Sequence, residues 1–258
     1  MGRILCSVAL NLAYGAITTA LSVWGILFCR TEARAIWLGR SWGRAMLATA
    51  RACGIQLEIS GAEHLPRDGA ALIASAHQSA FDTMIWMAVL PRGGFVLKRE
   101  LLSLPLFGRL LARAGMIAVD RAGGAGAMRT LLRGATRACA EGRQMVIFPQ
   151  GTRVDPAAAP APLHPGVAAM AMRTGLPVLP AWLDSGRCWP RRGFWRYPGT
   201  VHLHLLPPLP AHTPRETLMA TLAGVFAADR PGPGDNSGDQ APDRLTFQNK
   251  SATQPYDE

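Results

Sequence analysis

The sequence predicts an α/β domain, with a mixed, largely parallel sheet flanked by helices, preceded by an N-terminal membrane-associated helical segment. Two observations predict it. Short apolar runs typical of buried strands recur over residues 55–206 and alternate with stretches of helical periodicity. The first 54 residues instead hold a long uncharged run and an arginine-rich amphipathic pattern. The length of 258 residues suits one such domain with appendages.

The N-terminal segment begins with 26 uncharged residues between Arg3 and Arg30. At about 1.5 Å per residue, a helix of this length is long enough to cross a hydrocarbon core of about 30 Å. A cleaved signal peptide is the alternative, but its apolar region usually has only about 7–15 residues. We therefore expect a membrane helix that either spans the bilayer or turns back near Gly15.

Residues 30–54 carry an amphipathic pattern. On a helical wheel their arginines fall within an arc of about 120°, and apolar residues occupy the remaining face. These arginines are Arg30, Arg34, Arg40, Arg44 and Arg51. Such a helix is expected on an anionic bilayer surface, and its arginines predict the cytoplasmic side. The alternative is a core helix with a solvated arginine face. We interpret residues 1–54 as membrane-anchoring helices.

The predicted α/β domain covers residues 55–228. Strands are expected at residues 55–59, 71–76, 95–98, 116–119, 145–148, 177–182 and 201–206. Helices are expected at residues 79–90, 105–114, 125–141, 166–174 and 214–228. Residues 229–258 are rich in Pro, Gly, Asp, Asn and Gln, which predicts a disordered C-terminal tail.

Composition narrows the class of protein. Hydrophobic residues make up 49% of the chain and charged residues 17%, which excludes a wholly disordered protein. The net charge is +10, with +13 over residues 1–228. This charge suits nucleic acid, an anionic membrane or a phosphorylated ligand. Five widely spaced cysteines without C-x-x-C favour packed thiols over disulfides or a zinc ribbon.

Polar residues follow the strand expected at 71–76, and loops at strand ends carry the chemistry of such sheets. His77 and Asp82 lie five residues apart in this loop. A carboxylate that holds one imidazole nitrogen leaves the other to act as a base. The alternative is that Ser79 and Asp82 only cap the following helix.

A second polar loop, Pro149–Arg153, follows the strand expected at 145–148. Its tight turn, hydroxyl and guanidinium suit an anionic oxygen cluster. Lys98 and Arg121 also stand at strand ends. Each cation alone is compatible with a solvated charge, but three at neighbouring strand ends favour a phosphate pocket. His202 and His204 lack an obvious third ligand nearby, so no metal site is predicted.

Four motifs in this order resemble those of the glycerolipid acyltransferase family, specifically its bacterial 1-acyl-glycerol-3-phosphate acyltransferases. They are H-x4-D at 77–82, K-x-E-(x4)-P-x-x-G-(x6)-G-(x4)-D-R at 98–121, FPQGTR at 148–153 and the V-L-P strand within 176–180. The resemblance covers about residues 50–210. It implies that His77 is the general base and Asp82 its orienting carboxylate. It further implies that the acceptor phosphate is bound by Gly151, Thr152 and Arg153, in a pocket shaped by Lys98 and Arg121.

The resemblance implies transfer of a fatty acyl group from acyl-ACP or acyl-CoA to the free hydroxyl of 1-acyl-glycerol-3-phosphate. The product would be phosphatidic acid, made for phospholipid biosynthesis at the cytoplasmic side of a bacterial inner membrane. The expected partners are membrane lipids, the lysophospholipid acceptor and the acyl carrier protein or coenzyme A thioester. No cofactor, metal or nucleic acid is expected.

The sequence departs from the family at Gln150, where glutamate is usual. Glutamine keeps the shape and one acceptor oxygen but loses the charge. We place Gln150 among the substrate-binding residues and interpret it as an adaptation to this enzyme's acceptor. Two alternatives remain open: the same chemistry on another lyso-acceptor, such as lyso-ornithine lipid, and a non-catalytic lipid-binding protein on the same scaffold. A nucleic-acid binder is disfavoured because no base-reading motif is present.

Overall fold

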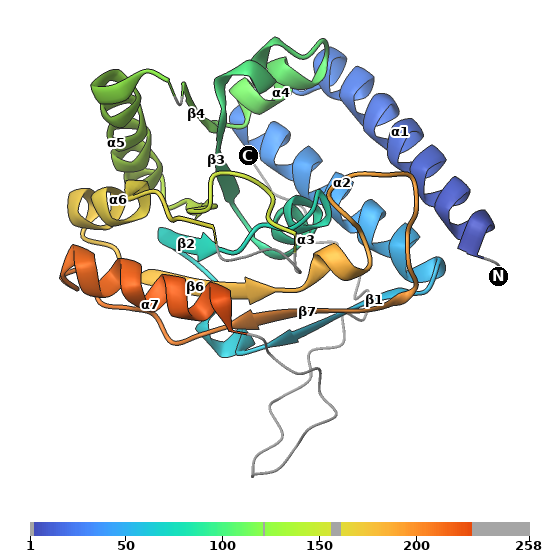
Figure 1. Cartoon of the computed structure of the whole chain (residues 1–258). Coiled ribbons are helices and arrows are strands. Elements are labelled where there is room, and N and C mark those ends of the chain that lie inside the picture. Colours follow the sequence, from blue (N-terminus) through green and yellow to red (C-terminus); the bar gives the residue numbers. More distant parts are fainter. Residues whose placement is uncertain (1–2, 121, 156–160, 229–258) are drawn as a thin grey trace.

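The computed structural model describes residues 3–120, 122–155 and 161–228, and a β-sheet forms the centre of this part of the chain (Figure 1). Its strand order is β1-β7-β6-β2-β5-β3-β4. The strands are β1 (Ile55–Ser60), β2 (Ala71–Ser75), β3 (Gly93–Lys98), β4 (Ile117–Val119), β5 (Gln144–Ile147), β6 (Val178–Leu183) and β7 (Gly199–Leu205). Neighbouring strands are parallel except for β6 and β7, so the predicted mixed, largely parallel sheet is confirmed.

Helices cover both faces of the sheet. They are α1 (Arg3–Phe28), α2 (Glu32–Ala52), α3 (Phe81–Val89), α4 (Phe107–Arg113), α5 (Gly124–Ala140), α6 (Gly166–Thr174) and α7 (Arg215–Ala227). Three short 3-10 helices join them: η1 (Ala62–His64), η2 (Arg99–Ser103) and η3 (Ser185–Arg187). One apolar core packs α2 and α3 on the sheet, and a second packs α5, α6 and α7 on the opposite face. Every strand and helix expected over residues 55–228 is present, with ends within two residues of the expected bounds.

Helix α1 is continuous through Gly15, so the chain does not turn back there. Within the described residues it is the one helix long and apolar enough to cross a bilayer. One side of α1 is buried against the rest of the chain through residues such as Cys6, Ser7 and Leu10. The other side exposes large apolar residues. We call these the α1 apolar face: Ile4, Leu5, Val8, Leu12, Val23, Trp24, Leu27 and Phe28.

Helix α2 packs into the core, which corrects the expectation that its apolar face meets a bilayer. Ile36, Leu38 and Met46 are buried. Gly43 lies so close to α3 that an added Cβ would come within 2.7 Å of the α3 backbone. The apolar face of α2 therefore already has a partner, the almost wholly apolar α3. Arg34, Arg44 and Arg51 remain exposed, so α2 is a core helix with a solvated arginine face.

The cysteines are free thiols, and all except Cys139 are buried, which confirms the prediction of packed thiols. Burial, assisted by the nearby Asp184 carboxylate, raises the pKa of Cys188 to about 11, so this thiol is neutral at physiological pH. Residues 229–258, for which a disordered tail was expected, lie outside the described residues.

Candidate active site

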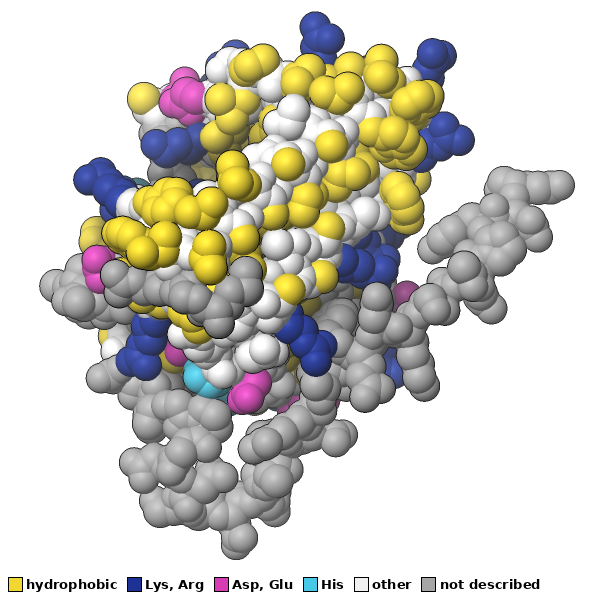
Figure 2. Space-filling view, turned by 90° about the vertical axis from the view of Figure 1, so that its right-hand side faces the viewer, with side chains coloured by type: hydrophobic (Ala, Val, Ile, Leu, Met, Phe, Trp, Pro, Cys, Tyr) yellow, Lys and Arg dark blue, Asp and Glu magenta, His cyan; other side chains and the backbone are white. Residues whose placement is uncertain are grey.

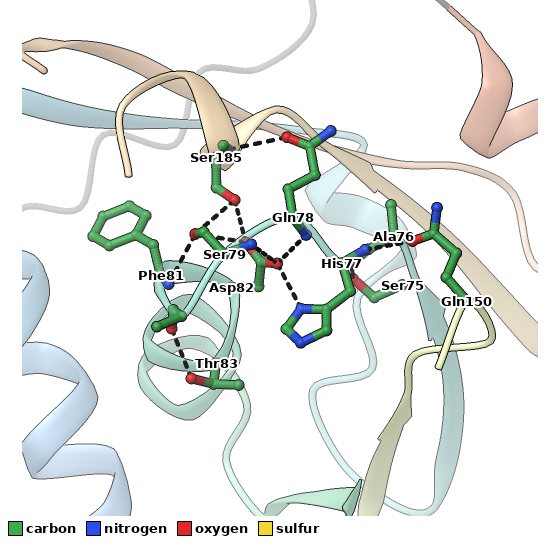
Figure 3. A network of polar contacts seen from close by, with 12 residues as sticks. Ser75, Ala76, His77, Gln78, Ser79, Phe81, Asp82, Thr83, Gln150 and Ser185 are labelled. Atoms are coloured by element: carbon green, nitrogen blue, oxygen red, sulfur yellow. Dashed lines mark hydrogen bonds and ion pairs between the residues drawn. The ribbon is translucent and has the colours of Figure 1, made fainter. Parts of the chain in front are cut away.

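His77 and Asp82 meet in the loop between β2 and α3 (Figure 3). His77 Nδ1 lies 2.8 Å from Asp82 Oδ2. The Asp82 side chain is fully buried, and the His77 side chain keeps 13% of its surface exposed. This pairing holds the imidazole through Nδ1 and leaves Nε2 available to accept a proton.

Asp82 also stabilises the start of α3. Its Oδ2 accepts hydrogen bonds from the backbone N–H groups of Gln78, at 2.7 Å, and Ser79, at 3.0 Å. The Asp82 side chain therefore both contacts the imidazole and caps the start of the helix, the two alternatives that the sequence left open. The backbone N–H groups fix the carboxylate, and the fixed carboxylate orients the imidazole.

The loop after β5 contacts the His77 loop at three points. The His77 ring stacks on Phe148, with ring centroids 3.9 Å apart and planes inclined by 18°. The Val154 N–H donates to the His77 carbonyl at 2.7 Å. The His77 N–H donates to Gln150 Oε1 at 2.8 Å. Two motifs more than 60 residues apart in the sequence thus form one rigid unit.

Gln150 has a different position from the substrate-binding one expected from the sequence. Its side chain is 8% exposed, its oxygen is engaged by the His77 backbone, and it does not line the large cavity of the described chain. In this structure Gln150 therefore contacts the histidine loop and not the cavity. A glutamate oxygen would accept the same hydrogen bond, which explains why both residues fit this position.

A cavity of about 1010 Å³ opens beside His77. Its walls are mostly apolar and come from α1, α2, η2, α4, β3 and α5. Polar side chains also line the cavity and include those expected from the sequence: Lys98, Thr152 and Arg153. Such a cavity suits a molecule with long apolar chains and an anionic group.

The structure brings together most of the predicted phosphate-binding residues. Gly151, Thr152, Arg153 and Lys98 line the cavity that His77 lines. The Gly151 N–H is not free, because it donates to the Phe148 carbonyl at 2.9 Å and closes a turn that Gly151 enters with φ +66°. Arg121 lies outside the described residues.

Sequence reasoning missed two basic side chains of this cavity, His164 and Arg191. Neither belongs to a motif with a recognisable spacing, and each comes from a loop. The histidines considered as metal ligands have other partners: His202 Nδ1 lies 2.9 Å from Asp184 Oδ2, and His204 Nδ1 contacts Ser60 Oγ. In the described ranges no three His, Cys, Asp or Glu side chains cluster as metal ligands would.

The mixed sheet, the His–Asp pair and the apolar cavity with several cations in its lining suit an enzyme that activates a hydroxyl group on a lipid-like acceptor. Residues 56–184 match the model of the family described as Acyltransferase. The chain belongs to this family, so the resemblance read from the four motifs is confirmed.

Known relatives agree with this assignment. The chain is 33% identical over 207 residues to a 1-acyl-sn-glycerol-3-phosphate acyltransferase of Pseudomonas aeruginosa, covering 78% of this chain and 80% of the relative. It is 30% identical over 161 residues to the human 1-acyl-sn-glycerol-3-phosphate acyltransferase alpha, of which it covers 56%. The crystal structure of the 1-acyl-sn-glycerophosphate acyltransferase PlsC from Thermotoga maritima superposes with a TM-score of 0.69 at 20% identity. That likeness covers 88% of this chain and 95% of PlsC, and it shows a shared fold.

Proposed function

We propose that this chain transfers a fatty acyl group from a thioester to the free hydroxyl of 1-acyl-sn-glycerol-3-phosphate, which yields phosphatidic acid. The observation that carries the proposal is the His77–Asp82 pair at the wall of a large apolar cavity whose lining includes Lys98 and Arg153. The names of the relatives in Pseudomonas aeruginosa and human support the same substrate.

In the proposed reaction His77 Nε2 takes the proton of the acceptor hydroxyl while its oxygen attacks the thioester carbonyl. The tetrahedral intermediate collapses, the C–S bond breaks, and the thiolate leaves and takes the proton from His77. Asp82 keeps the Nδ1 proton in place throughout. Atoms and charges balance with the two substrates alone, so we propose no cofactor.

An acyl-serine intermediate is disfavoured by the position of Ser79. Its side chain is fully buried, and its hydroxyl oxygen accepts a hydrogen bond from the Phe81 N–H at 3.0 Å. The same oxygen lies 2.9 Å from Ser185 Oγ. Ser79 is therefore committed to the protein interior, and direct attack by the acceptor hydroxyl remains the simplest course.

We assign the acceptor phosphate to Arg153 and Lys98, which line the cavity with His77. A guanidinium suits a phosphate because it can donate two parallel hydrogen bonds, and an ammonium adds a point charge. Thr152 adds a hydroxyl to the lining of the same cavity.

One assay tests the proposed function. The purified protein is incubated with lysophosphatidate and either acyl-CoA or acyl-ACP, and the lipid product is identified. Phosphatidic acid is the expected product. Turnover of lyso-ornithine lipid but not of lysophosphatidate would identify another acceptor. Binding of lysolipids without any product would favour a lipid-binding protein.

The apolar helix α1 and the bacterial relative support membrane association, and we propose that α1 lies along the cytoplasmic face of the inner membrane without crossing it. Its beginning, middle and end are each fastened to the rest of the chain. The Arg196 N–H donates to Ser7 Oγ at 2.9 Å, Trp42 Nε1 donates to Thr18 Oγ1 at 3.0 Å, and Arg113 donates to the Cys29 carbonyl at 3.3 Å. A crossing helix would have to carry one end away from these partners.

The side of the molecule that carries α1 has the character of a bilayer-facing surface. Figure 2 shows hydrophobic side chains in a broad band over this side, with lysine and arginine side chains near the edges. Trp24 contacts both Phe28 and Trp37 of α2, with ring centroids 5.5 and 6.1 Å away. Aromatic rings and arginines suit the interface between lipid tails and anionic headgroups.

We predict that Leu12→Asp weakens binding to anionic lipid vesicles at least tenfold. Leu12 is 68% exposed on the α1 apolar face. Burial of a leucine in lipid contributes about 1.5–3 kcal/mol, and every 1.4 kcal/mol is about a tenfold change in affinity. Vesicle sedimentation measures the change. Met172→Asp is the matched control, because Met172 is 73% exposed on α6, on the opposite side of the molecule in Figure 1. Equal loss in both variants would contradict the assignment.

We predict that Gln150→Glu leaves the preference between lysophosphatidate and a non-phosphate lyso-acceptor within about twofold of wild type, because the side chain contacts the His77 backbone and not the cavity. Gln150→Ala should instead destabilise the fold by about 1–3 kcal/mol, since it removes the acceptor of the His77 N–H. Competition assays and thermal unfolding measure these effects. A several-fold change in acceptor preference in Gln150→Glu would contradict this prediction and support the interpretation that Gln150 is an adaptation to the acceptor.

A further inference from the structure

The two oxygens of the Asp82 carboxylate are held in different ways. Oδ2 accepts from two backbone N–H groups and faces His77 Nδ1. Oδ1 instead accepts from hydroxyl groups: Ser185 Oγ, just after β6, and Ser79 Oγ, at 3.4 Å. Figure 3 shows both serines on the side of Asp82 away from the imidazole. One half of the carboxylate therefore depends on hydroxyl donors.

The hydroxyl protons of Ser79 and Ser185 show which serine is the main hydrogen-bond donor to Asp82 Oδ1. Ser79 Oγ accepts from the Phe81 N–H, and its single proton has two candidate acceptors, Ser185 Oγ at 2.9 Å and Asp82 Oδ1 at 3.4 Å. The shorter contact is the better hydrogen bond. If Ser79 donates to Ser185, then the Ser185 proton goes to Asp82 Oδ1. The chain Phe81 N–H, Ser79 O–H, Ser185 O–H then ends on the carboxylate, and each bond strengthens the next.

Ser185 is itself firmly placed. It is fully buried as the first residue of η3. The preceding residue, Asp184, accepts from the His202 N–H at 2.7 Å, which ties η3 to β7. The following residue, Gly186, donates its N–H to Gln78 Oε1 at 3.0 Å, which ties η3 to the histidine loop. The hydroxyl is therefore presented to Asp82 from a rigid support.

We infer that Ser185 is a positioning residue for the reaction: its hydroxyl orients the Asp82 carboxylate so that Oδ2 stays aimed at His77 Nδ1. This inference rests on the roles proposed above for His77 and Asp82. The inference assigns a role to the segment after β6. Ser185 in this segment neither lines the cavity nor contacts the imidazole, so it acts through Asp82. Loss of the hydroxyl leaves Oδ1 with only the long contact to Ser79.

Ser185→Ala is expected to lower kcat by roughly one order of magnitude and to leave KM for both substrates unchanged, because a hydrogen bond to a charged group is lost without change to the cavity. Ser79→Ala is the matched control. It removes the neighbouring hydroxyl and should have a smaller effect, since the Ser185 bond to Asp82 remains. A larger loss in Ser79→Ala than in Ser185→Ala would overturn the inference.

A double-mutant cycle separates positioning from a general structural role. In an Asp82→Ala background, Ser185→Ala should change kcat by less than twofold, because the group through which Ser185 acts is gone. An equal loss in both backgrounds would overturn the inference. Ser185→Cys keeps nearly the same size with a weaker donor and should lose activity while unfolding close to the wild-type temperature, which keeps the test informative if Ser185→Ala folds poorly. A wild-type kcat in Ser185→Cys would also overturn the inference that Ser185 positions Asp82.

Failure of the inference and failure of the proposed function give different results. Near wild-type turnover in both His77→Ala and Asp82→Ala would remove the proposed mechanism, and the inference with it. A large loss in those two variants, together with wild-type turnover in Ser185→Ala, would overturn the role of Ser185 alone.

Discussion

His77→Ala is expected to reduce kcat by about 10²–10⁴ while leaving the fold intact, because general-base assistance typically contributes that factor. The side chain is held by one contact to Asp82 and by stacking on Phe148, so its removal leaves no buried charge without a hydrogen bond. Asp82 retains its backbone donors at Gln78 and Ser79. Steady-state assays with lysophosphatidate, with circular dichroism to check the fold, measure the effect.

His164→Ala is the control for this variant. His164 lines the same cavity, so its removal tests the loss of a cavity imidazole that does not pair with Asp82. We expect kcat to fall by less than about tenfold. If folded His77→Ala protein keeps near wild-type turnover, or if His164→Ala loses as much, His77 is not the base.

Arg153→Ala is expected to raise KM for lysophosphatidate by roughly one to two orders of magnitude, with a smaller change in kcat. Loss of a charge-assisted hydrogen bond weakens binding by about 1.5–3 kcal/mol. The half-buried position of Arg153 on the cavity wall with His77 favours the upper part of this range. Steady-state kinetics at saturating acyl donor measure KM for the acceptor.

Arg192→Ala tests whether any loss of positive charge has the same effect. Arg192 is exposed and does not line the cavity, whereas its neighbour Arg191 does. Its substitution should leave KM for the acceptor within about twofold. A change of KM for the acyl donor alone in Arg153→Ala would assign Arg153 to the donor and refute the phosphate assignment.

Local patterns were sufficient to predict the secondary structure and the contact between His77 and Asp82. The strands alternate or run apolar because the sheet is covered on both faces, and their lengths follow from that burial. His77 and Asp82 could be paired from the sequence because they lie five residues apart around a single helix start. The backbone geometry of one short segment determines whether two residues so close in the sequence meet, so their spacing is enough to predict the contact.

Other parts of the site depend on contacts that local spacing does not encode. The periodicity of residues 30–54 identified the apolar face of α2 but not its partner, and α3 covers that face instead of lipid. Gln150 was expected among the substrate-binding residues, and local spacing gave no sign that its oxygen accepts from the His77 N–H, 73 residues away in the chain.

The succession of strands and helices along the chain, the apolar character of α1, the His–Asp pair and the family could all be predicted from the sequence. The partner of each helix face, the direction of the Gln150 side chain and the contact of Ser185 with Asp82 across 103 residues became known from the three-dimensional packing. The reason is physical. Periodicity and short spacing report the conformation of one segment, whereas a side chain's partner depends on how separate segments pack, and many partners satisfy the same apolar or polar requirement.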